Sequence, residues 1–121
     1  MTDAKVPAAP KGSGPAGRRL WRSVVTEYSL DVHEQLLLTQ ACRTADHLDD
    51  IADLLATAPK TVKNRFGEIC AHPLLVEHRQ QSIVLGRLVA MLRLPEGEEG
   101  DARRPQRRGG ARGVYGVRAV S

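Results

Sequence analysis

The residues of this 121-residue chain that could do chemistry are few, and potential metal ligands come first. Cys70, His72 and His78 offer a thiolate and two imidazoles, which are ligands that zinc prefers. A fourth ligand is missing, and the spacing matches no common zinc site. A second group consists of carboxylates on one predicted helix face, which is usually a solvated face: Asp46, Asp49, Asp50 and Asp53. We therefore expect neither a metal site nor a cofactor.

Catalytic motifs are also missing from the sequence. It contains no G-x-x-x-x-G-K-S/T motif, and the Gly-rich segment 109–113 follows no predicted strand and opens no predicted helix. A nucleophilic cysteine would need an exposed and activated thiol. Cys42 and Cys70 both lie in apolar contexts, and we expect both to be buried. The chain is therefore predicted not to be an enzyme.

Charge is the clearest chemical signal in the sequence. The net charge is +4, and the basic residues concentrate at the two ends, while the middle has slightly more acids than bases. Basic ends suit a polyanion such as DNA, although they could also serve solubility alone. Binding through phosphates would weaken steeply with salt. The candidate DNA-binding residues are Arg18, Arg19, Arg22, Lys60, Lys63, Arg65, Arg103, Arg104, Arg107 and Arg108.

Three helices are expected to position these residues. The first spans residues 14–28, because Pro15 fits a first helical position and apolar residues follow at helical spacing. The second spans residues 31–56 and begins at a D-x-x-E capping pair. The third spans residues 72–95, between Pro73 at its first turn and a proline that it cannot continue past. The predicted fold is mainly α, with a three-helix core.

The segment between the second and third helices has two interpretations. In one, residues 61–63 and 68–70 are short strands of a small β-hairpin, with Gly67 at a positive φ in the turn. In the other, residues 61–69 form the recognition helix of a helix-turn-helix, with basic residues facing DNA. Gly67 would then lie within a short helix, at a cost of about 1 kcal/mol. This cost favours the hairpin without excluding the helix.

The third helix is apolar around most of its circumference, and three helices cannot cover it. We expect residues 1–13 and 96–121 to be disordered basic tails, because neither can bury enough apolar surface. Residues 14–95 then form a single helical domain for DNA binding and oligomerisation, with a core that is marginal for a monomer. Other copies of the chain would cover the remaining apolar surface. The predicted subunit contacts are Leu75, Leu85, Leu88, Val89 and Leu92.

From about residue 11 to residue 95, the chain resembles the small terminase subunits of tailed double-stranded DNA bacteriophages, of the actinobacteriophage type. The motifs are G-P-A-G-R-R-L-W at 14–21, H-E at 33–34 with A-C-R-T-A-D at 41–46, H-P-L-L-V-E at 72–77 with R-Q-Q at 79–81, and L-R-L-P at 92–95. Their order and spacing carry the resemblance. The C-terminal tail is similar to relatives in composition only.

The resemblance implies a non-catalytic subunit of a genome-packaging terminase. Such subunits form homo-oligomeric rings, here expected to hold roughly 8–12 copies. They bind viral double-stranded DNA, and they recruit and regulate the large ATPase and nuclease subunit. The implied location is the host cytoplasm, and no apolar run reaches the ~18–20 residues of a membrane span. Many relatives carry a helix-turn-helix module before the oligomerisation core, and no complete module precedes residue 14.

Two other functions fit the same sequence. A dimeric transcriptional regulator would use residues 48–70 as a helix-turn-helix and bind a palindromic site. A structural or adaptor protein would carry basic ends that bind no nucleic acid. Oligomer size separates the ring from the dimer, and salt-dependent DNA binding separates both from the adaptor.

Overall fold

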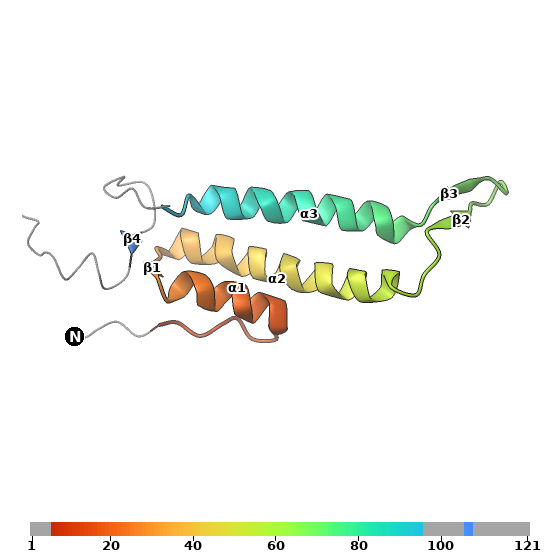
Figure 1. The fold of residues 1–121 in the computed structure, drawn as a ribbon. Coiled ribbons are helices and arrows are strands. Elements are labelled where there is room, and N and C mark those ends of the chain that lie inside the picture. The colour runs from red at the N-terminus through yellow and green to blue at the C-terminus, as the bar shows by residue number, and fades with distance from the viewer. Residues whose placement is uncertain (1–5, 96–105, 108–121) are drawn as a thin grey trace, which may run out of the picture.

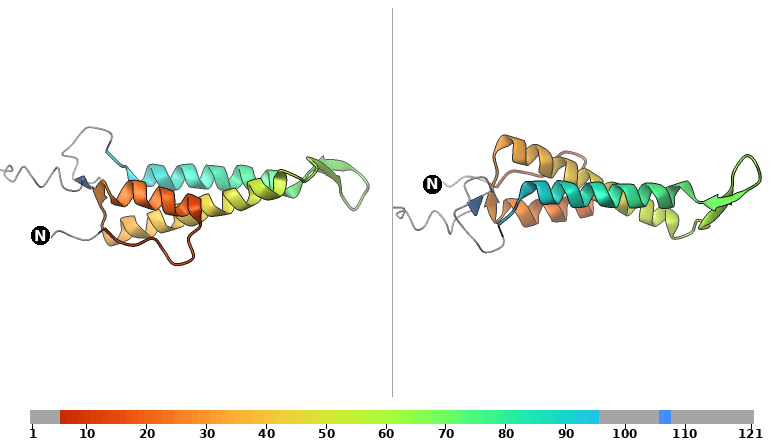
Figure 2. Two further views of the ribbon diagram at one scale, coloured as in Figure 1. Left: turned by 60° about the horizontal axis from the view of Figure 1, so that its bottom comes forward. Right: turned by 90° about the horizontal axis from the view of Figure 1, so that it is seen from above.

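A computed structural model describes residues 6–95 and 106–107 of the chain, and it is mainly helical (Figure 1). The helices are α1 (Pro15–Val25), α2 (Val32–Leu55) and α3 (Pro73–Leu92). Helices α2 and α3 run antiparallel and lie side by side, while α1 packs against the N-terminal half of α2 (Figures 1 and 2). The predicted three-helix core is therefore confirmed.

The segment between α2 and α3 is a β-hairpin, as the first interpretation predicts. Strand β2 (Thr61–Lys63) pairs antiparallel with β3 (Ile69–Ala71), and Gly67 has a φ of 77° in the turn. The second strand begins one residue later than expected. The hairpin projects beyond the ends of the two helices (Figures 1 and 2). A recognition helix over residues 61–69 is therefore wrong.

A second pair of short strands lies at the opposite end of the helices and was not predicted. Strand β1 (Tyr28–Ser29), which follows α1, pairs antiparallel with β4 (Gln106–Arg107). The buried Tyr28 hydroxyl donates to the Pro95 carbonyl oxygen over 2.9 Å. This hydrogen bond ties the chain after α3 to the connection between α1 and α2.

The hydrophobic core lies where all three helices meet, on the α1 side of the molecule. Trp21 anchors α1 in this core, as the sequence predicts, and its indole Nε1 donates to the Pro7 carbonyl oxygen over 2.9 Å. Ala9 also packs against the core. Residues 6–9 therefore lie against α1 and are ordered. The rest of the expected disorder, at residues 1–5 and at most of residues 96–121, lies outside the described residues. The buried core residues are Trp21, Val24, Val25, Tyr28, Leu38, Cys42 and Leu92.

The N-terminus of α1 is capped by a side chain from α2. The Asp46 carboxylate accepts hydrogen bonds from the Gly14 N–H over 2.7 Å and the Gly17 N–H over 2.8 Å. A Cβ atom on Gly17 would lie 2.5 Å from this carboxylate and 2.9 Å from the Cys42 carbonyl oxygen, so the close approach requires glycine. Asp46 was expected on a solvated face and instead joins two helices.

Replacing Asp46 with alanine is expected to destabilise the fold by about 1–3 kcal/mol, because two N–H groups of the first turn lose a charged acceptor. Urea unfolding followed by circular dichroism measures the change. Asp49→Ala is the matched control, since Asp49 is exposed on the same helix and should contribute within about 0.5 kcal/mol. Equal stability of the two variants would show that the Asp46 cap does not hold α1 in place.

Candidate subunit and nucleic-acid interfaces

The apolar residues of α3 divide between two faces. The residues of its inner face recur at intervals of four and three residues, which is the spacing of a helix packed along another helix. Leu92 is 1% exposed within the core, and the other inner-face residues are half-buried. Helix α2 therefore covers this face. The inner face consists of Leu74, His78, Gln81, Leu85, Leu88 and Leu92.

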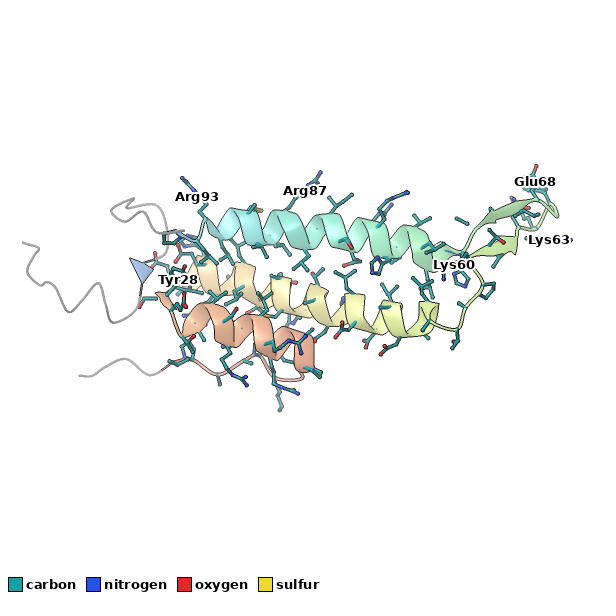
Figure 3. The ribbon with its side chains drawn as sticks, in the orientation of Figure 1. Tyr28, Lys60, Lys63, Glu68, Arg87 and Arg93 are labelled. Carbon is teal, nitrogen blue, oxygen red and sulfur yellow. The ribbon has the colours of Figure 1, made fainter. Side chains whose placement is uncertain are left out.

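The outer face of α3 consists of Val76, Ile83, Val84 and Met91. Steps of seven residues, from 76 to 83 and from 84 to 91, return to nearly the same side of a helix. The exposed fractions of these side chains are 36, 49, 41 and 57%, respectively. Arg87, between them in sequence, points away from α2 (Figure 3). No element among residues 6–95 covers the outer face, and no helix there is both long and apolar enough to cross a bilayer.

Helix α2 also exposes large apolar side chains. Val32, Leu36 and Leu54 are 76, 63 and 58% exposed, respectively. Val32 and Leu36 lie one turn apart near the start of α2, whereas Leu54 lies near its end. Both α2 and α3 therefore expose large apolar side chains to solvent in the single chain.

The structure places the predicted subunit contacts on different surfaces. Leu92 is buried within the chain itself, so it is not available to a second copy. Leu85 and Leu88 lie on the inner face, where substitutions would disturb the fold, and Leu75 is half-buried. Val89 is 37% exposed and can still contribute. The outer-face residues were missed, although their seven-residue spacing is visible in the sequence.

The basic residues of α1 are exposed, as expected. The Arg18 guanidinium donates a hydrogen bond to the Ser13 carbonyl oxygen, which commits part of this side chain to the preceding loop. Arg18 and Arg22 also line a pocket of about 270 Å³, together with Trp21 and the segment 6–9. Arg19 and Arg22 are therefore the α1 residues best placed to meet a phosphate backbone.

The β2–β3 hairpin carries the second basic group, Lys60, Lys63 and Arg65, and all three are exposed. Figure 3 shows Lys60 and Lys63 on this segment. This group lies beyond the end of α2, whereas α1 packs on the other half of that helix (Figure 1). The structure therefore does not join the two groups into one patch. The candidates Arg103, Arg104 and Arg108 lie outside the described residues, and Arg107 is described only as part of strand β4.

Among the described residues, Cys70, His72 and His78 do not come together as a group of potential metal ligands, whereas three residues at the start of α2 do. His72 Nδ1 accepts from the Leu74 N–H over 3.1 Å, which makes it the N-cap of α3. Asp31, His33 and Glu34 place one donor atom each within 4.8 Å of one another. Glu34 already accepts from the Asp31 N–H over 2.7 Å, as expected of the predicted capping pair. Helix capping thus accounts for the positions of His72, Asp31 and Glu34.

The two cysteines differ in environment. Cys42 is fully buried, and burial together with the Asp46 charge raises the pKa of its thiol to about 11. It therefore stays protonated at neutral pH and is a poor nucleophile. Cys70 is exposed on β3, contrary to the expectation that both thiols are buried. The hairpin projects from the helices, and no core lies beneath this strand.

Comparison of the chain with protein-family models, curated proteins and solved structures finds no match. The functional assignment therefore depends on the sequence motifs and on the geometry described above.

Proposed function

We propose that the chain is the DNA-recognition subunit of a phage genome-packaging terminase. It assembles into a ring, binds viral double-stranded DNA, and recruits and regulates the large ATPase and nuclease subunit in the host cytoplasm. It has no catalytic role of its own. The observation that carries this proposal is the outer face of α3, which no element among residues 6–95 covers and which a neighbouring copy would bury.

Repeated contacts between the apolar surfaces of neighbouring copies would produce a ring. The exposed apolar residues of α2, such as Leu36 and Leu54, lie on a different helix from the outer face of α3. A contact between the α3 surface of one copy and the α2 surface of the next is heterologous. Such contacts close into a cyclic oligomer when the rotation between copies permits.

The motifs behind the resemblance to small terminases also meet in space. Gly14 and Gly17 belong to the first motif, and Asp46 belongs to the A-C-R-T-A-D motif. The hydrogen bonds from the two glycines to Asp46 join these segments, which are about thirty residues apart. The shared motifs thus correspond to the contact that fixes α1, with its arginines, on α2.

DNA binding would use the exposed cations of α1 and of the hairpin. Each phosphate that they neutralise releases counterions, and a ring repeats the same weak contact many times. The dimeric regulator loses its main support, since its recognition helix is replaced by a hairpin.

The terminase role itself is tested with the large subunit of the same virus. Addition of this chain is expected to change the rate of ATP hydrolysis by the large subunit in the presence of DNA. The control is Ile83→Asp, which should remain folded but not assembled, and should therefore lose the effect. A hydrolysis rate that is unchanged at saturating concentrations of the chain would contradict the terminase assignment, even if DNA binding is observed.

A further inference from the structure

The β2–β3 hairpin carries an aromatic side chain that the fold does not use. Phe66 is 72% exposed at the turn, whereas Trp21 and Tyr28 are buried in the core. The Phe66 ring lies against the Arg65 guanidinium, whose carbon is 5.0 Å from the ring centroid. A large apolar ring at the tip of a projecting hairpin contributes little to stability and is well placed to contact a partner.

The backbone that presents Phe66 is held by several hydrogen bonds. The Asn64 side-chain oxygen accepts from the Phe66 N–H over 2.8 Å and from the Glu68 N–H over 3.0 Å. The Gly67 N–H donates to the Asn64 carbonyl oxygen, and the Asn64 N–H to that of Glu68, each over 2.9 Å. The tip is therefore preorganised, which lowers the entropy lost on binding.

The charges around Phe66 indicate the kind of partner. Lys60, Lys63 and Arg65 are all exposed on the hairpin. The acid of this segment, Glu68, has one carboxylate oxygen accepting from the Asn64 side-chain amide over 3.1 Å. An apolar ring with Arg65 against it, on a hairpin that also carries Lys60 and Lys63, complements a polyanion with an apolar interior. Duplex DNA, with stacked bases behind its phosphates, has this chemistry.

We propose that Phe66 is a wedge that inserts between adjacent base pairs from the minor groove and bends the duplex. Lys60, Lys63 and Arg65 would bind the flanking phosphates and hold the tip in place. Apolar wedges of this kind unstack one base step and bend DNA by about 20–90°. The inference deepens the proposed DNA-binding function, on which it rests, by stating how the duplex is held and deformed.

The test uses the full-length protein and a duplex of about 30 base pairs with donor and acceptor dyes at its two ends. Energy transfer between the dyes measures bending, and fluorescence anisotropy across a salt series measures binding. Wild-type protein is expected to increase energy transfer at saturation. Phe66→Ala is expected to bind with an unchanged salt slope but to lose this increase. Its thermal unfolding should match wild type, since the ring is 72% exposed and buries little apolar surface.

Two matched variants separate the wedge from other effects of the hairpin. Ile69→Ala removes an apolar side chain of equal exposure, 72%, from strand β3 and should retain the bend. Lys63→Ala should reduce the salt slope by about one and also retain the bend. Three results would overturn the wedge without affecting the DNA-binding function. They are a duplex still bent by Phe66→Ala, a duplex no longer bent by Ile69→Ala, and a duplex that wild-type protein binds without bending. Absence of wild-type binding at low salt would overturn the DNA-binding function and the wedge together.

Discussion

Replacing Ile83 with aspartate is expected to convert the assembled protein into monomers. Ile83 lies on the outer face of α3 and is 49% exposed in the single chain, so the substitution leaves the fold intact. Between two copies, however, the carboxylate would be buried in an apolar contact, at a cost of several kcal/mol per interface. Size-exclusion chromatography with light scattering should show a shift from the assembled mass to 13.2 kDa.

Ser82→Asp is the matched control for this experiment. Ser82 is exposed, precedes Ile83 on the same helix, and lies away from the outer face, so an equal added charge should leave the assembly intact. Leu85→Asp should instead reduce the helical circular dichroism signal, because Leu85 packs on the inner face. A large oligomer formed by Ile83→Asp, or dissociation of Ser82→Asp, would show that copies do not meet at the outer face.

Reversing the charges of Arg19 and Arg22 is expected to reduce DNA affinity by about 10–100-fold at low salt, because attraction to phosphates becomes repulsion. Both side chains are exposed on α1, and neither provides the hydrogen bond by which Arg18 holds Ser13. Anisotropy of a labelled duplex across a salt series measures the loss. The slope of log affinity against log salt should also fall by about 0.9 for each phosphate contact removed.

The charge-preserving double variant, Arg19→Lys with Arg22→Lys, is the control for this reversal. It keeps both cations on α1 and should retain most of the affinity, because phosphate attraction is largely electrostatic. Unchanged affinity of the reversed variant at low salt would exclude α1 as a DNA surface. The cations of the hairpin would then be the remaining candidates among the described residues.

Local signals made the elements of this fold predictable. Pro15 and Pro73 at first helical turns and the Asp31–Glu34 capping pair set where the three helices begin. Gly67 at a positive φ favoured the hairpin over a helix. Each of these signals acts within a few residues, so the sequence alone contains it.

Contacts between distant segments were not predictable in the same way. The role of Asp46 depends on where α1 lies against α2, and its sequence neighbours are aspartates of a solvated face. The N-terminal segment is placed by the hydrogen bond from Trp21 to Pro7, which no periodicity reveals.

The sequence predicts that α3 carries a subunit interface, but it does not predict which residues of α3 form it. The sequence shows that α3 carries more apolar residues than one neighbour can cover, but large apolar residues occur on both its inner and its outer face. Leu88 and Val84 are indistinguishable until the position of α2 is known. The structure therefore changes which residues should be substituted to test the interface. That other copies of the chain cover this surface stays a prediction.

The absolute mass of the purified wild-type protein, measured by native mass spectrometry, tests the proposed ring most directly. The chain has a mass of 13.2 kDa, and a ring of roughly 8–12 copies would have a mass of about 106–158 kDa. A single species within this range is the expected result. A monomer, or a dimer of about 26 kDa that persists at micromolar concentration, would contradict the ring and with it the proposed role in genome packaging.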